Sequence, residues 1–305
     1  MIVIDGSFGE GGGQIVRTAL ALSTLTGKPF EIKNIRSGRP IPGLKNQHLY
    51  SIKILKLLSD SFSEGDFQGS TYLKYVPSTI KGRTLSVNIG TAGSITLLLQ
   101  SVIVPCLFAE GKTRLKIVGG TDVAWSMTFD YFKNVLLPYL SIFAKIEVEL
   151  IKRGYYPKGN GKVDITIKPN YSVSKFGSFN EFLTVLRENV PKINLVEQGS
   201  LEYIEGVSHA SSNLEKSNVA ERQARSARAI LNKLCCPIKI GVEYCNTDSA
   251  GSGIALWAVF SSSDRKVIIG SDSLGAPKKP SEVVGKNAAE SLIRSINSKA
   301  PVDKH

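Results

Sequence analysis

The sequence twice opens an apolar helix with a short glycine-rich run, GEGGG and then GTAG, and the same series of elements follows each opening. The first run, residues 9–13, precedes a helical pattern over residues 14–26, where apolar side chains recur every three or four positions. The second run, residues 90–93, precedes a similar pattern over residues 94–109. This self-similarity, at a spacing of about 80 residues, predicts repeated structural modules.

The elements that follow each helix also correspond. We expect a strand, a polar loop, a second helix and further strands at residues 29–35, 36–43, 47–59 and 70–76, and again at 113–118, 119–126, 127–143 and 146–151. This order predicts an α+β fold whose large domain consists of three pseudo-symmetric βαβαβ-type repeats. The third repeat is expected to be incomplete, with a strand at 162–168 and a helix at 281–296.

The segment that interrupts the third repeat has its own alternation of elements. We expect an arginine-rich helix over residues 219–234 and strands at 201–206, 238–244, 254–260 and 266–269. An extra helix is expected before this segment, over residues 179–190. This pattern predicts a small inserted α/β domain. The expected division is 1–190 for the first part of the large domain, 191–274 for the inserted domain and 275–305 for the continuation of the large domain.

The net charge restricts the class of binding partner but does not identify one. The chain carries 38 Lys and Arg against 26 Asp and Glu, a net charge of +12, which favours encounters with polyanions. Nucleic acid, nucleotides, acidic membranes and plain solubility all remain open. The most apolar stretch, 95–108, is interrupted by Gln100, Ser101 and Pro105 and is too short to span a bilayer. We therefore expect a cytoplasmic protein without a membrane segment.

The four cysteines do not have the spacing of a zinc site. Cys106, Cys235, Cys236 and Cys245 contain no C-x-x-C pair. Buried free thiols are the simpler interpretation, and a disulfide that involves Cys245 stays open.

The first glycine run could bind phosphate. It lies between a strand and a helix start, where free backbone N–H groups and the helix dipole favour an anion. Glu10 within it would repel phosphate unless it holds a divalent cation, so it hints at nucleotide with Mg²⁺. A plain tight turn is the alternative. No Gly-x-x-x-x-Gly-Lys-Ser/Thr loop occurs, which argues against P-loop kinases and GTPases.

Basic and polar residues cluster in sequence around this run. Arg17, Arg36 and Arg39 suit contacts with phosphate oxygens, and Gln47-His48 begins the next helix. His48 could donate to phosphate or act as an acid or base, or it could be structural.

Two further polar residues stand in or beside apolar segments. Gln100 interrupts an apolar helix, where an amide needs a partner, and Asp122 follows a glycine pair. Each could face a ligand or satisfy an internal group.

Taken together, these motifs closely resemble the RNA 3′-terminal phosphate cyclase family in its archaeal branch, over nearly the whole chain. They are Asp5-Gly6, Gly9-Glu10-Gly11-Gly12-Gly13-Gln14 with Arg17, Arg36-Ser37-Gly38-Arg39-Pro40, Gln47-His48, Gly90-Thr91-Ala92-Gly93-Ser94 with Gln100, Gly119-Gly120-Thr121-Asp122, Arg153-Gly154 to Gly161, Gly206 to Ala210, Ala220 to Ala224 and Gly270 to Gly275. In the motif at 153–161, Asn160 replaces the middle residue of the family's glycine triplet, although Asn tolerates positive φ.

The resemblance implies a fold and a reaction. The fold is a large domain of three α+β repeats with one small inserted domain. The reaction uses ATP to form a histidine-AMP intermediate, transfers AMP to an RNA 3′-phosphate, and closes a 2′,3′-cyclic phosphodiester with release of AMP and pyrophosphate.

Residue by residue, the resemblance implies two groups of site residues. Glu10, Arg17, Arg36, Arg39, Gln47 and His48 would act on phosphate, with Glu10 also holding Mg²⁺ or another divalent cation. Gly11, Gly12, Gly13, Gln100, Asp122 and His305 would contact the nucleotide. The partners implied are ATP and an RNA with a 3′-terminal phosphate.

The end of the chain departs from the family pattern. The family's nucleophilic histidine is expected beyond residue 305, so the chain is either truncated, which we favour, or an inactive relative, and as given it should not adenylylate itself. Two other hypotheses remain: a non-catalytic RNA-binding relative in ribosome biogenesis, and an enolpyruvyl-transferase-like enzyme, against which the motif at 153–161 argues.

Overall fold

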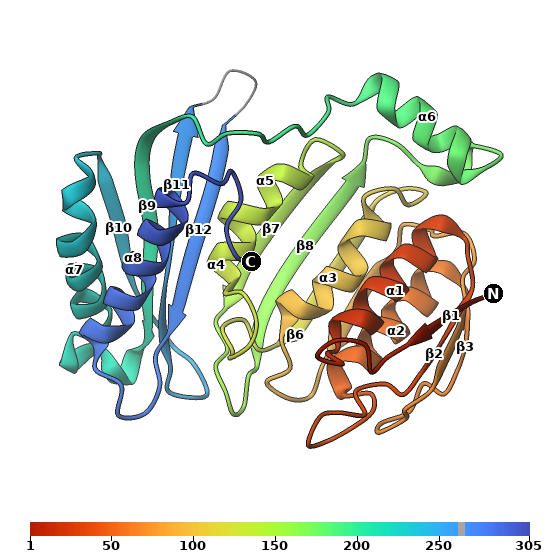
Figure 1. The fold of residues 1–305 in the computed structure, drawn as a ribbon. Helices are drawn as coiled ribbons and strands as arrows, with labels where there is room; N and C mark the ends of the chain where they lie inside the picture. The colour runs from red at the N-terminus through yellow and green to blue at the C-terminus, as the bar shows by residue number, and fades with distance from the viewer. Residues whose placement is uncertain (262–265) are drawn as a thin grey trace. The chain divides into compact units, whose positions relative to one another are not determined.

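A computed structural model describes residues 1–261 and 266–305. The chain forms two compact units, each assembled from separate stretches of sequence (Figure 1). Unit 1 comprises Met1–Val118, Leu140–Glu149 and Val163–Pro191. Unit 2 comprises Gly119–Tyr139, Leu150–Lys162 and Lys192–His305.

The first sheet of unit 1 contains four strands in the order β1-β2-β4-β3. They are β1 (Ile2–Asp5), β2 (Phe30–Lys33), β3 (Phe62–Glu64) and β4 (Leu73–Val76). β1 and β2 are parallel, while β4 is antiparallel to both β2 and β3. Helices α1 (Gln14–Thr26) and α2 (Asn46–Ser59) connect these strands and pack against α3 (Ile95–Cys106).

The second sheet repeats this strand order as β5-β6-β8-β7. Its strands are β5 (Thr84–Asn88), β6 (Thr113–Gly119), β7 (Ala144–Lys152) and β8 (Gly161–Pro169), with β5 parallel to β6. The strand that we expected to begin a third repeat, residues 162–168, is β8 and belongs to this second sheet. That expectation was wrong because sheet membership is set by pairing with distant strands, which local periodicity does not report.

Helix starts and stops follow local sequence. α1 ends where Gly27 adopts φ 71° and donates its N–H to Ser23 O, as glycine readily does at a helix end. Its Val16 and Leu20 are buried. α3 begins at Ser94, whose hydroxyl accepts the N–H of Leu97, a typical N-cap. The N-cap of α1, Gly13, has no side chain that could accept a backbone N–H group.

Unit 2 contains one four-stranded sheet in the order β10-β9-β11-β12. Its strands are β9 (Ser200–Ser211), β10 (Ile238–Cys245), β11 (Ser252–Ser261) and β12 (Val267–Leu274). Helices α7 (Val219–Leu231) and α8 (Ser281–Asn297) pack on each other and on this sheet around an apolar core. They approach so closely that a methyl carbon on Gly285 would lie 2.1 Å from Gln223 O.

The remaining elements are short. They are α4 (Phe129–Tyr131), a π-helical turn (Phe132–Leu136), α5 (Leu137–Leu140), α6 (Phe179–Asn189), and 3₁₀ turns at Val173–Lys175, Ser212–Ser217 and Asn232–Leu234. The mixture of three sheets with separate helices agrees with the predicted α+β class. The three-repeat organisation, the inserted domain and their boundaries stay predictions.

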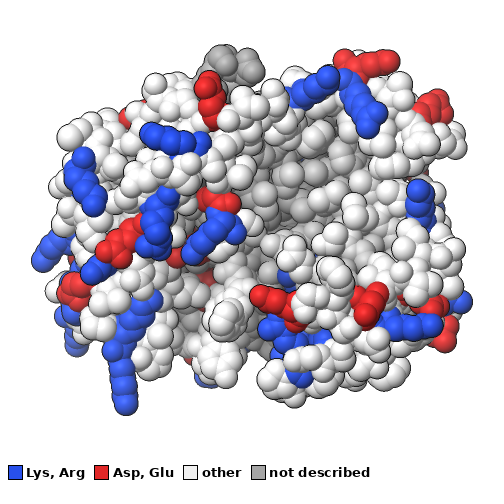
Figure 2. All heavy atoms as spheres, viewed as in Figure 1, with Lys and Arg blue, Asp and Glu red and all other residues white. Residues whose placement is uncertain are grey.

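Two simpler expectations can be compared with the structure. All four cysteines are free, so Cys245 forms no disulfide, and only Cys106 is buried, whereas Cys235 is exposed. The expectation of buried thiols was therefore wrong for most of them. Among the described residues, no helix combines the length and the apolarity that crossing a bilayer needs. In Figure 2, lysine and arginine side chains gather on the left of the viewed face and along its edges, with acidic side chains beside them.

Candidate active site

The glycine loop of unit 1 connects β1 to an α-helix that has no side-chain cap. Gly9 and Gly11 adopt φ values of +59° and +56°, a region that favours glycine. The N–H of Gly11 donates to Phe8 O and closes the turn. Because the N-cap of α1 has no side chain, backbone N–H groups of its first turn remain available to an anion.

Glu10 projects from this loop into solvent. Its Oε2 lies 3.1 Å from Arg39 Nη2, and its side chain is 91 % exposed. An ion pair so exposed contributes little to stability. The pair therefore places a carboxylate and a guanidinium beside the glycine loop, and both side chains remain free to change partners.

His48 lies against the glycine loop from the first turn of α2. Its side chain is buried, and its Nδ1 accepts the backbone N–H of Lys45 at 3.0 Å. A methyl carbon on Gly13 would lie 2.2 Å from His48 Nε2. The imidazole therefore occupies the space that any side chain at Gly13 would need.

The protonation state of His48 follows from its surroundings. Burial, together with the positive charges of Arg17, Arg36 and Lys45, lowers the pKa of His48 to about 3. The ring is thus neutral near pH 7, and because Nδ1 is an acceptor, its proton resides on Nε2. That Nε2–H has no hydrogen-bond partner among the described residues, so it is a buried donor that an anion could satisfy.

Arg17 and Gln100 join α1 to α3 beside the same loop. Arg17 Nε donates to Gln100 Oε1 at 3.2 Å, which supplies the partner that an amide in an apolar helix requires. Arg17 Nη1 would lie 3.2 Å from a methyl carbon on Gly13. Burial lowers the pKa of Arg17, although a guanidinium remains charged.

Arg36 is held by its own loop. It adopts φ +55°, and its Nη1 donates to Ile41 O at 2.9 Å and to Gly43 O at 3.0 Å. Burial first, and then Arg39, lower its pKa. One part of the Arg36 guanidinium therefore shapes the loop that carries Arg39.

The structure thus brings together one group of predicted residues in unit 1. A methyl carbon on Gly12 would lie 3.6 Å from Arg39 Nη2, which places this arginine beside the helix start. Gln47 is half-buried in the first turn of α2. The group consists of Glu10, Gly11, Gly12, Gly13, Arg17, Arg39, His48 and Gln100. Their roles in binding or chemistry stay predictions.

The low pKa of His48 predicts acid sensitivity. The unfolded chain binds a proton at His48 below about pH 6.5 and the folded chain does not, so the free energy of unfolding falls as pH decreases. From pH 7 to 5 we expect His48 to contribute a loss of about 2 kcal/mol. His48→Gln should remove this part of the pH dependence in urea denaturation followed by circular dichroism.

His305 provides the control for this prediction. A hydrogen bond with Asp272 raises its pKa, so its contribution is present at low pH and is lost as pH rises. His305→Gln should therefore leave the acid-induced loss in place. An unchanged pH profile in His48→Gln would show that the His48 imidazole is not held neutral.

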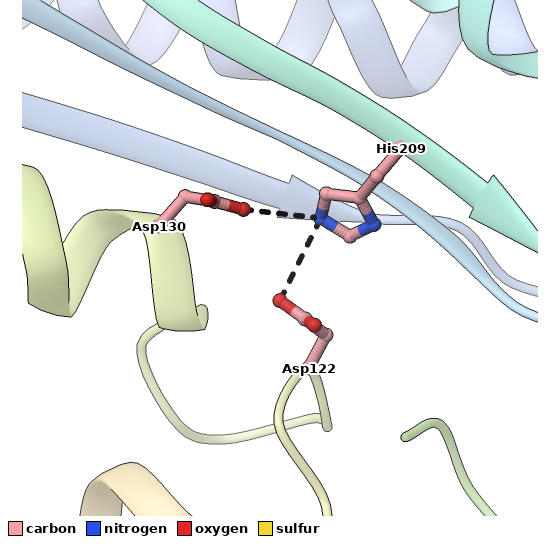
Figure 3. A group of neighbouring side chains, drawn as sticks. All are labelled: Asp122, Asp130 and His209. Carbon is pink, nitrogen blue, oxygen red and sulfur yellow. Dashed lines mark ion pairs between the residues drawn. The ribbon is translucent and has the colours of Figure 1, made fainter. Parts of the chain in front are cut away.

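Unit 2 contains a second group of polar side chains, buried in its interior (Figure 3). Candidate ligand atoms of Asp122, Asp130 and His209 all lie within 4.8 Å of one another. His209 Nε2 is 3.6 Å from Asp122 Oδ1 and 3.9 Å from Asp130 Oδ2. Its Nδ1 lies 2.8 Å from Tyr155 OH. Two carboxylates and an imidazole form a donor set that a divalent metal ion can use.

Arg153 supplies positive charge to the same group. Its side chain is 1 % exposed, and its Nη1 and Nη2 lie 3.2 Å from Asp122 Oδ2 and 2.8 Å from Asp130 Oδ2. Nη2 also lies 2.9 Å from Glu243 Oε2. Because the buried guanidinium already contacts oxygens of both aspartates, it takes the place that a divalent cation would need and would repel one. We therefore interpret these residues as a structural ion cluster, called the Arg153 cluster below.

Protonation in the Arg153 cluster is shifted by burial. Desolvation raises the pKa of Asp130 to about 6, against the opposing effect of Arg153. Desolvation and the charge of Arg153 lower the pKa of His209 to about 3, so His209 is neutral near pH 7. The cluster therefore holds a neutral imidazole beside its charged groups.

Two residues expected to contact nucleotide lie in unit 2. Asp122 accepts hydrogen bonds from Thr121 Oγ1 at 2.7 Å and Phe129 N at 3.3 Å, besides its contact with Arg153. His305 Nε2 lies 3.2 Å from Asp272 Oδ1, and its ring lies 4.7 Å from that of Tyr131. Their part in nucleotide binding stays a prediction.

Sequence reasoning did not find the Arg153 cluster. Arg153 was noted only within a motif, Asp130 was not singled out, and His209 carried no functional argument. One signal was present: Asp130 stands in the otherwise apolar run 129–132, where a charged residue implies a buried partner. The partner itself could not be read from the sequence.

Comparison with known proteins gives one consistent result. The family model described as "RNA 3'-terminal phosphate cyclase" matches residues 8–305. A protein of that name from Saccharolobus islandicus is 46 % identical, over 100 % of this chain and 84 % of its own length. Relatives of the same name from Archaeoglobus fulgidus, at 45 % over 100 % and 84 %, and Pyrobaculum aerophilum, at 43 % over 99 % and 81 %, agree.

Proposed function

The chain belongs to the RNA 3′-terminal phosphate cyclase family, and we propose that it uses ATP to convert an RNA 3′-terminal phosphate into a 2′,3′-cyclic phosphodiester. One observation carries the assignment of the site. The buried Nε2–H of His48 has no partner among the described residues and lies against Gly13, at the uncapped start of α1. Such a donor beside free backbone N–H groups and two arginines suits a phosphate.

The proposed reaction proceeds in three steps. A histidine nitrogen attacks the α-phosphorus of ATP and displaces pyrophosphate. An oxygen of the RNA 3′-phosphate then attacks the same phosphorus and displaces the histidine. Finally the 2′-hydroxyl attacks the 3′-phosphorus, loses its proton and displaces AMP.

Adenylylation solves a leaving-group problem. A phosphate monoester resists attack because oxide or hydroxide would have to depart, whereas AMP is a stable leaving group. The neighbouring 2′-hydroxyl reacts at high effective concentration because it is held in the same molecule. The protein then has to position the phosphates and offset their charge.

The residues of unit 1 suit that task. Arg17, held by Gln100, and the exposed Arg39 would contact phosphate oxygens, and His48 would donate its Nε2–H. Because its pKa is about 3, His48 would act as a neutral donor rather than as a cationic acid. Arg36 would act mainly by positioning Arg39, and Gln47 lies at the same end of α2.

Glu10 fits a divalent cation of the nucleotide. Its carboxylate is exposed, and Oε2 is engaged by Arg39, the one partner of Glu10 among the described residues. Mg²⁺ commonly binds through one or two carboxylates together with substrate phosphates. Bound there, it would offset phosphate charge.

The shared strand order of the two sheets in unit 1 supports the proposed repeats. On this view each repeat contributes a sheet and helices, and the glycine openings of α1 and α3 are equivalent positions. The small sheet of unit 2, with α7, would form most of the inserted domain, and α8 would belong to the continuation of the large domain.

The test uses full-length protein, ATP labelled at the α-phosphate, and RNA ending in a 3′-phosphate. We expect labelled protein without RNA, and cyclised ends and free AMP when RNA is added. Arg39→Ala should slow cyclisation about tenfold, because a partly exposed guanidinium is screened by water. Arg83→Ala, which removes an exposed arginine paired with Asp60, should not change the rate. Absence of both labelled protein and cyclised RNA would reject the function.

A further inference from the structure

Trp125 has an unusual exposure and an unusual backbone. Its side chain is 98 % exposed, whereas tryptophan is highly buried on average. It also adopts φ +67°, in the left-handed region that bulky residues rarely occupy. An exposed indole and a strained backbone conformation are both unfavourable, so their occurrence at one residue suggests that the indole binds a ligand.

The loop that carries Trp125 is anchored on both sides. The side chain of Asp122 accepts the backbone N–H of Phe129, and Ser126 Oγ donates to Val123 O at 2.8 Å. The backbone N–H of Thr128 donates to Asp272 Oδ2 at 2.8 Å. The indole is therefore presented by a fixed loop, and little ordering entropy would be lost when a flat ligand stacks on it.

A second loop of unit 2 is joined to the Trp125 loop and is basic. The backbone N–H of Thr121 donates to Gly154 O at 2.9 Å, and Thr121 Oγ1 accepts the N–H of Gly154 at 2.9 Å. Two residues after Gly154, Tyr156 is 75 % exposed. The segment Leu150–Lys162 contains no acidic residue, and its Lys158 and Lys162 are exposed, whereas Lys152 pairs with Asp248 and Arg153 is buried.

We propose that Trp125 is a stacking platform for a nucleobase of the single-stranded RNA substrate, with Tyr156 and the exposed Lys158 and Lys162 beside the strand. This inference rests on the proposed function. Exposed aromatic rings next to cations are the usual means by which proteins hold single-stranded nucleic acid. A base in a strand can place one face on the indole and the other on its neighbour, so an open platform suits it better than it suits free ATP.

The test compares Trp125→Ala and Trp125→Phe with the wild-type full-length protein at one fixed salt concentration. Binding of a dye-labelled RNA with a 3′-phosphate is measured by fluorescence anisotropy. We expect Trp125→Ala to weaken binding about tenfold, within the range measured for one stacked base, and Trp125→Phe to retain most affinity. Phe67→Ala, which removes an exposed aromatic side chain from unit 1, should bind like the wild type.

RNAs with one abasic nucleotide identify the stacked base. At the contacted position the missing base should weaken wild-type binding and should not weaken binding to Trp125→Ala any further, because the same contact is already lost. If wild-type protein cyclises RNA and Trp125→Ala binds each RNA as tightly as the wild type does, the stacking platform is rejected and the proposed function stands. If Trp125→Ala instead impairs only adenylylation without RNA, the indole serves ATP and the proposal is again rejected. If wild-type protein neither binds nor cyclises RNA, the function itself fails.

Discussion

Replacing Arg153 with methionine is expected to lower the free energy of unfolding of unit 2 by about 4 kcal/mol, because it leaves buried carboxylates without their counter-charge. The Arg153 side chain is 1 % exposed and contacts Asp122 and Asp130. Methionine fills similar space but donates no hydrogen bond. Both tryptophans, Trp125 and Trp257, belong to unit 2, so denaturation followed by tryptophan fluorescence reports on this unit.

Lys152→Met is the matched control for this prediction. Lys152 precedes Arg153 and pairs with Asp248 at 2.6 Å, but both side chains are partly exposed. Its replacement should cost less than about 1 kcal/mol. A loss of similar size in both variants would contradict the assignment of a buried cluster.

The effect of Arg153→Met should also depend on pH. Without the guanidinium, the pKa of Asp130, already raised to about 6, should rise further. The folded variant would then take up protons that the unfolded chain does not bind, so the deficit should shrink as pH decreases from 8 to 5.

Gly13→Ala is expected to reduce RNA cyclisation by the full-length protein by about 10²- to 10³-fold, the range for losing one well-placed donor. The added methyl carbon would lie 2.2 Å from His48 Nε2 and 3.2 Å from Arg17 Nη1. Alanine suits the φ of −65° at Gly13, so the effect should come from displacing these side chains rather than from backbone strain. Cyclisation rate, protein adenylylation and circular dichroism would be measured together.

Gly241→Ala makes the same chemical change where there is room for it. A methyl carbon there would lie 3.8 Å from its nearest neighbour, Gly206 O, an ordinary contact. It should leave cyclisation unchanged. Full activity in folded Gly13→Ala would show that the space between the glycine loop and His48 is not used by substrate.

Local signals predicted the helices well. The helix over 14–26 was confirmed to the residue, since glycines mark its start, apolar side chains recur along one face and Gly27 ends it. Strand 162–168 was placed in the wrong module, although a strand does cover it. Its sequence reports an extended segment, whereas its neighbours in the sheet depend on chain far away.

The candidate site divides in a similar way. The basic residues around the glycine loop were visible in sequence because they lie close together along the chain. The proton position on His48 was not, since it depends on one backbone N–H and on burial between two helices. The Arg153 cluster was missed because Asp122, Asp130, Arg153 and His209 come from four separate places in the sequence.

The difference between the two glycine-opened helices has a further consequence. Ser94 fills the first turn of α3 with its own hydroxyl, whereas Gly13 leaves the first turn of α1 vacant. The two helix starts therefore differ in chemistry. At α3 a serine hydroxyl already accepts a backbone N–H group, whereas at α1 the N–H groups can bind a ligand. Moving one hydroxymethyl group between these positions, by Gly13→Ser or Ser94→Gly, would be the smallest change able to block anion binding at α1 or to permit it at α3.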